Sequence, residues 1–218
     1  MDIDRIGSSG AEFGSFSLEP QVARADFLHS ATRRVCDIAV ALAAIICLAP
    51  ILLIAALAIK LDCPGPVIFR QRRIGMNGRT FVIFKFRTMT VAEDGSKIAQ
   101  AQRNDPRVTK VGRLLRQSSI DELPQFMNVL RGDMSLVGPR PHAVAHDEHY
   151  CALLPDYRLR RRVKPGITGW AQINGSRGET ASLKEMERRV QLDLWYIDHR
   201  SLSLDLQIAW RTCIEVVR

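Results

Sequence analysis

An uncharged apolar run of 22 residues extends from Ile38 to Ile59. A helix needs about 20 such residues to cross the hydrocarbon core of a bilayer. The alternative is a core helix of a soluble protein, but uncharged apolar runs of roughly 18 residues or more are typical of membrane segments. The run therefore predicts a helix that enters a membrane.

A central proline and basic flanks bear on how this segment meets the membrane. Pro50 removes one backbone hydrogen bond and clashes with the preceding turn, so it kinks or breaks a helix. Arg33 and Arg34 precede the run, and Lys60 and several arginines from Arg70 onward follow it. Because basic flanks stay in the cytoplasm, we expect a re-entrant, monotopic helix on the cytoplasmic face of the inner membrane, among inner-leaflet lipids. A straight span with the N-terminal tail outside is the alternative.

The net charge narrows the classes of partner. The chain has 31 Lys and Arg against 23 Asp and Glu, a formal charge of +8. A basic chain suits nucleic acid, an anionic membrane surface or phosphorylated substrates. No zinc-finger spacing, basic leucine zipper or aromatic RNA-binding signature occurs, so nucleic acid is not expected as a partner. The five cysteines have irregular spacing without a C-x-x-C motif, which indicates reduced thiols in a cytosolic setting.

The whole chain predicts an α+β fold that is mainly helical, in three parts. We expect a disordered tail over residues 1–21, the membrane helix within 22–62, and a compact cytosolic domain with amphipathic surface helices over 63–218. Asn77-Gly78 between two β-rich runs predicts a hairpin. Helices are expected at 110–117, 121–130, 150–162, 182–197 and 202–217, with a polar loop at 90–107 and a Gly-rich stretch with one short strand at 163–178.

Adjacent carboxylates follow the first of these short helices. Asp121 and Glu122 lie five and six residues after Arg116, at the expected start of the next helix. An N-cap at Asp121, with Pro124 in the first turn, would explain them structurally. The functional alternative is a division of labour, in which one carboxylate attacks phosphorus and the other binds a divalent cation or handles a proton.

A second polar segment centres on Arg140, which lies between Pro139 and Pro141. Prolines stiffen the backbone on both sides, and a guanidinium on a stiff loop is a good bidentate phosphate ligand. Lys85 and Arg87 end a predicted strand and can add positive charge to the same pocket. The structural alternatives are a rigid surface turn for Arg140 and a strand edge guarded by cations for the other two.

Taken together, these segments resemble the monotopic polyprenyl-phosphate phosphoglycosyl transferases, also called bacterial sugar transferases. The similarity covers roughly Thr32 to the C-terminus. It is carried by the proline-containing helix, by FKFRTM at 84–89, by SSIDELPQFMNVLRGDMSLVGPRPH at 118–142 and by KPGITGWAQINGSRGET at 164–180. The DELPQ and GDMSLVGPRP motifs at this separation are highly specific for this family. They favour the functional alternatives given above for the paired carboxylates and for Arg140 over the structural ones.

The resemblance implies a two-step transfer. In this family the aspartate of the dyad, here Asp121, attacks the β-phosphorus of a UDP-sugar and releases UMP. Undecaprenyl phosphate then attacks the aspartyl-phosphosugar. The neighbouring Glu122 is implicated with Mg²⁺, so the dyad forms the expected metal site, and the phosphate-binding arginines map onto Arg116 and Arg140.

Two departures and several alternatives accompany this interpretation. Ala49 precedes Pro50 where relatives often carry serine, and the extra N-terminal membrane helices of larger relatives are not seen before Ala31, so we expect the catalytic unit alone.

The segment GWAQINGSRGET resembles the glucose-1-phosphate transferases of exopolysaccharide pathways, which favours UDP-glucose over UDP-galactose. An inactive membrane scaffold and a nucleic-acid-binding protein are the competing classes. The oligomeric state stays open, with a homodimer as one option.

Overall fold

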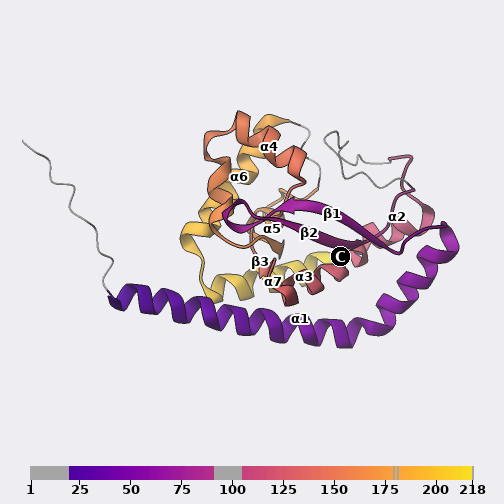
Figure 1. Ribbon diagram of the computed structural model, residues 1–218, viewed down its shortest axis with the longest axis horizontal. Helices are drawn as coiled ribbons and strands as arrows, with labels where there is room; N and C mark the ends of the chain where they lie inside the picture. Colours follow the sequence, from indigo (N-terminus) through magenta and orange to yellow (C-terminus); the bar gives the residue numbers. More distant parts are fainter. Residues whose placement is uncertain (1–19, 91–104, 179, 181, 218) are drawn as a thin grey trace, which may run out of the picture.

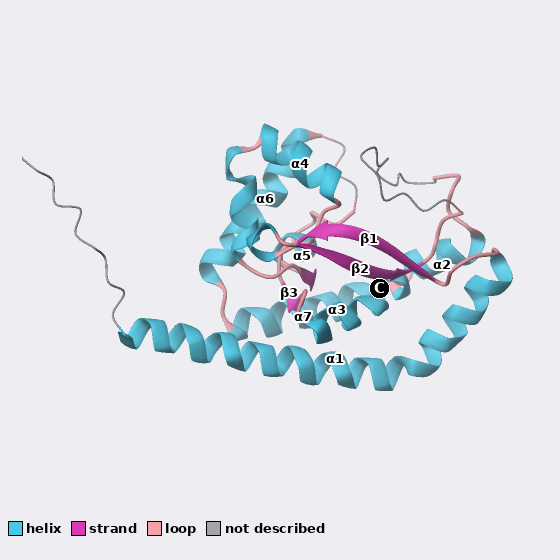
Figure 2. Ribbon diagram, in the orientation of Figure 1, coloured by secondary structure: helices cyan, strands magenta, loops and turns pink. Residues whose placement is uncertain are grey.

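The computed structural model describes residues 20–90, 105–178, 180 and 182–217. This part of the chain is mainly helical with two small sheets, in agreement with the expected α+β class (Figure 2). Residues 1–19 of the expected tail and most of the expected loop at 90–107 lie outside the described residues, whereas residues 20 and 21 already belong to a helix. The elements are α1 Pro20–Asp62, β1 Ile68–Ile74, η1 Met76–Gly78, β2 Thr80–Phe86, α2 Lys110–Gln117, η2 Ile120–Gln125, α3 Phe126–Arg131, β3 Ser135–Val137, α4 Val144–Leu153, η3 Pro155–Arg162, β4 Gly166–Thr168, α5 Trp170–Ile173, α6 Leu183–His199 and α7 Leu202–Val217.

Helix α1 is long, apolar and bent. It passes along one side of the domain and changes direction in its C-terminal half, which contains Pro50 (Figure 1). A proline inside a helix accounts for such a bend. The stretch Ser30–Asp62 is long and apolar enough to cross a membrane by length and composition, and little of its most apolar window is buried in the protein.

Both arms of α1 pack against the same domain. Before Pro50, Ala41 is fully buried against Val129 of α3. After Pro50, Ala55 and Ile59 are buried in a second apolar cluster that includes Leu115 of α2. The domain therefore lies on the inner side of the bend and contacts the helix on both sides of its proline (Figure 1).

Polar contacts attach the N-terminal arm of α1 to the domain. The guanidinium of Arg33 pairs with Asp205 at 2.8 Å. Arg34 donates to the carbonyl oxygens of Val129 and Leu130 at 2.6 and 2.8 Å. Asp37 accepts hydrogen bonds from the hydroxyl of Ser135 and the backbone N–H of Leu136. At the other end of the helix, Asp62 accepts from the backbone N–H of Val111.

The predicted hairpin is confirmed. Strands β1 and β2 are antiparallel, with Ile68 opposite Phe86 and Ile74 opposite Thr80. Asn77 and Gly78 both have positive φ, 56° and 75°, a conformation that these two residue types adopt most readily. The buried side chain of Asn128 in α3 hydrogen-bonds to both Val82 and Phe84, which fixes the edge of β2 beside the chain that carries the paired carboxylates.

Two predicted helices have different boundaries. The helix expected at 121–130 begins as the 3-10 helix η2 and becomes α-helical only at Phe126. The helix expected at 150–162 is two elements, because Leu154 is extended in front of Pro155. The predictions for α2 and α7 match the structure, and the side chain of Ser182 caps α6 by accepting from the N–H of Glu185.

The parallel pair β3–β4 was only half predicted, since the stretch 135–137 was not expected to be a strand. In this pair Ser135 lies opposite Gly166, and Val137 opposite Thr168. A Cβ atom on Gly138 would lie 2.5 Å from the carbonyl oxygen of Lys164, so only glycine permits this approach. The GDMSLVGPRP and KPGITGW motifs are therefore neighbours in space, and together they place Arg140.

Candidate active site

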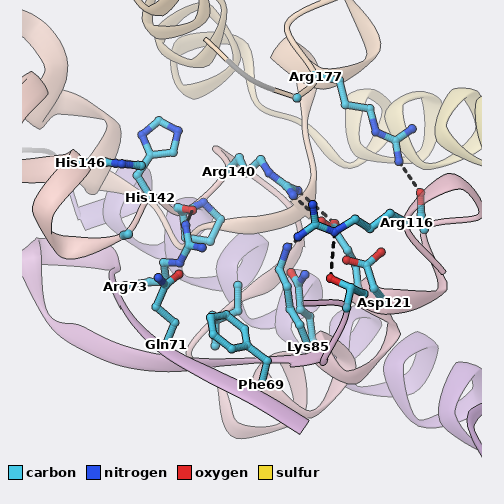
Figure 3. A pocket seen from close by; sticks show the side chains of 18 of the residues that line it. Phe69, Gln71, Arg73, Lys85, Arg116, Asp121, Arg140, His142, His146 and Arg177 are labelled. Atoms are coloured by element: carbon cyan, nitrogen blue, oxygen red, sulfur yellow. Dashed lines mark hydrogen bonds and ion pairs between the residues drawn. The ribbon is translucent and has the colours of Figure 1, made fainter. Parts of the chain in front are cut away.

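A cavity of about 420 Å³ opens between the β1–β2 hairpin, η2, the loop around Arg140 and the start of α6. All six sequence-predicted site residues are among those that line it (Figure 3). They are Lys85, Arg87, Arg116, Asp121, Glu122 and Arg140. The fold thus brings together residues that are up to 55 positions apart in the chain (140 minus 85).

Glu122 forms the centre of a charged cluster. Its Oε1 accepts from the ammonium group of Lys85 at 2.8 Å, and its carboxylate forms a two-point contact with the guanidinium of Arg140. Burial alone would raise the pKa of Glu122, but Arg140 and Lys85 together hold that pKa well below its usual range. Glu122 is therefore a fixed anion that positions two cations.

Asp121 has a different environment from its neighbour. Its side chain is 8% exposed, and it forms no hydrogen bond or ion pair with any other described residue. Burial raises its pKa and the charge of Glu122 adds to this, whereas Lys85, Arg116 and Arg140 lower it. A carboxylate whose oxygen atoms no described residue engages, close to cations and lining a cavity, is the arrangement that a nucleophile requires.

The two remaining predicted arginines have different partners. Arg116 lines the cavity, and its Nε donates to the hydroxyl of Thr88 at 2.8 Å (Figure 3). The guanidinium of Arg87 donates to the carbonyl oxygens of Cys63 and Pro64, just after α1. Arg87 thereby joins the end of α1 to β2, and its charged group is already engaged there.

The sequence did not reveal how Arg140 is positioned. Arg160 of η3, which is buried, donates to the carbonyl oxygen of Arg140 at 2.8 Å and pairs with Asp193 of α6 at the same distance. A basic run such as that at 158–164 is typical of a solvated helix face or of a contact with anionic headgroups. The local sequence does not distinguish the buried Arg160 from the more exposed arginines beside it, because its carboxylate partner lies 33 residues further along the chain.

The site can also be tested for a divalent cation. Within the described residues, no group of three or more His, Cys, Asp or Glu side chains is arranged to hold a metal ion. Mg²⁺, however, is usually bound by one or two carboxylates together with substrate phosphates and water. No described residue engages either carboxylate oxygen of Asp121, and Oε2 of Glu122 accepts one hydrogen bond from the described residues, which leaves it one acceptor position. The dyad therefore fits a substrate-associated Mg²⁺ ion.

Comparisons with known proteins agree with this geometry. A family model described as bacterial sugar transferase matches residues 28–218. A UDP-glucose:undecaprenyl-phosphate glucose-1-phosphate transferase of Escherichia coli (strain K12) is 56% identical over 180 residues, which is 83% of this chain and 39% of that protein. A protein of the same name from Caulobacter vibrioides is also 56% identical over 180 residues, which is 83% of this chain and 67% of its own length.

A more distant relative has a different sugar in its name. A UDP-N-acetylgalactosamine-undecaprenyl-phosphate N-acetylgalactosaminephosphotransferase of Aeromonas hydrophila is 42% identical over 185 residues, covering 85% of this chain and 43% of that protein. The chain spans about two fifths of the length of several of these relatives.

Proposed function

This chain belongs to the bacterial sugar transferase family, and from this premise we propose that it transfers glucose-1-phosphate from UDP-glucose to undecaprenyl phosphate. The products would be undecaprenyl-diphosphate-glucose and UMP, in the first membrane step of exopolysaccharide or capsule synthesis. The observation that carries the proposal is Asp121, a buried carboxylate without a partner among the described residues, in a cavity lined by cations.

In the first step, an oxygen of Asp121 forms a bond to the β-phosphorus of the donor. The bond from this phosphorus to the bridging oxygen breaks, and its electron pair leaves with UMP. Lys85 and Arg140 lie beside the dyad and stabilise the negative charge on the transferring group, the role that fixed cations have in phosphoryl transfer. Glu122 holds both cations in place and thereby avoids reorganisation during the reaction.

In the second step, a phosphate oxygen of undecaprenyl phosphate attacks the same phosphorus. The bond to Asp121 breaks, and the carboxylate is restored. A phosphate monoester is a weak nucleophile and an acyl phosphate is a reactive donor, so two steps through the aspartyl-phosphosugar have lower barriers than one direct transfer. A Mg²⁺ ion held by Asp121 and Glu122 would neutralise charge on the donor diphosphate.

The test of this proposal is UMP release with a panel of donors. We expect purified protein with undecaprenyl phosphate to release UMP fastest from UDP-glucose, more slowly from UDP-galactose, and roughly tenfold or more slowly from N-acetylated donors, a discrimination that a few pocket contacts can provide. The preference rests on the names of the relatives that are 56% identical. Equal or faster turnover with UDP-N-acetylgalactosamine, the donor in the name of the 42% identical relative, would overturn the sugar assignment. The absence of UMP release from every donor would favour the inactive scaffold.

We also propose that α1 enters the inner membrane from the cytoplasmic face and returns to it. Residues before and after Pro50 pack against one domain, as Ala41 and Ile59 illustrate. A helix that crossed the bilayer would have to separate one arm from that domain. It would also have to break the contacts of Arg33, Arg34 and Asp37 with the domain and move these groups across the hydrocarbon core, which is costly for charged side chains.

This topology predicts where the N-terminal tail lies. We expect a single cysteine at Ser15, in a background without the native cysteines, to be protected from a membrane-impermeant thiol reagent in intact cells. Labelling should appear only after the cells are opened. A single-cysteine protein with a known periplasmic position serves as the positive control. Labelling of the tail in intact cells would mean that α1 spans the membrane.

A further inference from the structure

Several residues that line the active-site cavity carry buried polar atoms without a partner among the described residues. Within the described part of the chain, no hydrogen bond is made by Nε of Arg189, Nε2 of His142, Nε2 of Gln125 or the hydroxyl of Thr180. These residues are 4%, 8%, 1% and 7% exposed, and all four line the cavity that contains Asp121. Buried polar atoms are nearly always satisfied, because leaving one unpaired costs free energy. Four such atoms in one cavity indicate a ligand.

His142 carries an unpaired hydrogen-bond donor among the described residues that line this cavity. Its Nδ1 faces the hydroxyl of Tyr157 and, at 3.4 Å, a guanidinium nitrogen of Arg160, which can only donate. Burial lowers the pKa of His142 well below its usual range, and nearby arginines add to this, so the ring is neutral. Since Nδ1 accepts, the proton lies on Nε2, the unpaired atom. Arg189 and Gln125 also offer N–H groups, so the ligand must be rich in acceptors.

Arg189 adds a positive charge that no described carboxylate pairs with directly. Its guanidinium donates to the carbonyl oxygen of Gly178 at 2.9 Å. Asp193, one turn further along α6, is bonded to Arg160 instead. Burial lowers the pKa of Arg189, and the charge of Arg160 adds to this effect. A buried cation without a counter-ion is costly for the free protein and is a ready site for an anion.

We propose that Arg189, with His142 and Gln125, binds the nucleoside-phosphate half of the donor, which leaves as UMP. This assignment rests on the proposed function. The β-phosphorus must lie at Asp121 and the sugar is uncharged, so the α-phosphate is the only other anion in the donor. When the bond between the β-phosphorus and the bridging oxygen breaks, that oxygen gains a negative charge on UMP. The guanidinium of Arg189 stabilises the leaving group as its charge develops.

The positions of Arg189 and His142 argue against the competing ligand, the phosphate of the lipid acceptor. Helix α4 and the N-terminal half of α6 lie on the side of the hairpin away from α1, and α6 runs towards α1 at its C-terminal end (Figure 1). Arg189 belongs to the N-terminal half of α6, and His142 lies two residues before the start of α4. An acceptor whose phosphate lies at membrane headgroups should approach from the side of α1. The nucleotide, which is supplied from the cytosol, fits the opposite end.

The experiment compares Arg189→Gln with Arg188→Gln, a matched charge change at an exposed neighbour on the same helix. Equilibrium binding of UMP is measured directly, without lipid or turnover. We expect Arg189→Gln to raise the Kd for UMP at least tenfold and to raise the KM for UDP-glucose, while Arg188→Gln leaves both unchanged. Arg189→Lys, which keeps the charge but loses the fork geometry, should be intermediate.

Three outcomes would overturn the proposal. The first is unchanged UMP affinity in a folded Arg189→Gln protein. The second is a rise in the KM for undecaprenyl phosphate alone, which would assign Arg189 to the acceptor. The third is a loss of the folded state in Arg189→Gln, which would make Arg189 structural, because removal of an unpaired buried charge should leave the thermal midpoint unchanged or higher. Failure of the transferase assay would leave the UMP-binding comparison intact, so the two proposals can fail separately.

Discussion

Asp121→Asn should reduce UMP release by roughly 10³-fold or more, because loss of a covalent nucleophile has effects of this size or larger in other enzymes. The amide cannot form the acyl-phosphate bond. In the wild-type protein, donor alone should give a phosphosugar adduct in the intact mass and about one equivalent of UMP. The variant should show neither, and Asp121→Ala should behave in the same way. Turnover of Asp121→Asn at the wild-type rate would refute the assignment of the nucleophile.

The stability of this variant provides a second readout. Asp121 is buried without a partner among the described residues, and burial raises its pKa, so its ionised form destabilises the folded state at neutral pH. Replacement by a neutral isostere should therefore leave the thermal midpoint unchanged or raise it by a few degrees. Asp156→Asn, at an exposed position in η3, is the matched control and should change neither activity nor midpoint. Asp121 is not an N-cap, because η2 begins at Ile120 with Ser119 as its cap residue, so a large fall in the midpoint of Asp121→Asn would indicate another structural role for this carboxylate.

Removal of divalent cations with excess chelator should reduce activity by roughly 10²-fold or more, because metal ions contribute several kcal/mol of charge stabilisation in such reactions. The physical reason is repulsion. The negative carboxylate of Asp121 must approach a doubly negative diphosphate. Lys85 and Arg140 offset only part of this repulsion, because both cations are also paired with Glu122. Added Mg²⁺ should restore activity in proportion to its free concentration.

The control for this prediction is the folded state in the presence of chelator. Because no described group of three or more potential ligands holds a structural metal, the thermal midpoint should not change when divalent cations are removed. Full activity in excess chelator would mean that Lys85, Arg116 and Arg140 stabilise the transferring phosphoryl group without a metal ion. A fall in the midpoint together with activity would instead indicate a structural metal.

Local sequence determined the elements that short-range physics controls. The apolar run predicted a helix that Pro50 kinks or breaks, and the structure has one continuous, bent helix; Asn77-Gly78 predicted the hairpin. Each of these features depends on residues within a few positions of one another, so the sequence contains the complete interaction. The helix predicted at 150–162 was too long, because the backbone is extended at Leu154, in front of Pro155, and divides the stretch into two elements.

The sequence by itself also determined the family and the identity of the dyad, through the motifs around Asp121 and Arg140. Only the tertiary structure decided which charged groups of the site are paired with one another. Glu122 is paired by Lys85 and Arg140, which are 37 and 18 positions away, and this pairing leaves Asp121 as the free carboxylate. Within the described part of the chain, Arg189 is likewise left without a carboxylate partner because Asp193 is bonded to Arg160. Charge pairing over such separations depends on how the elements pack, and spacing in the sequence does not encode it.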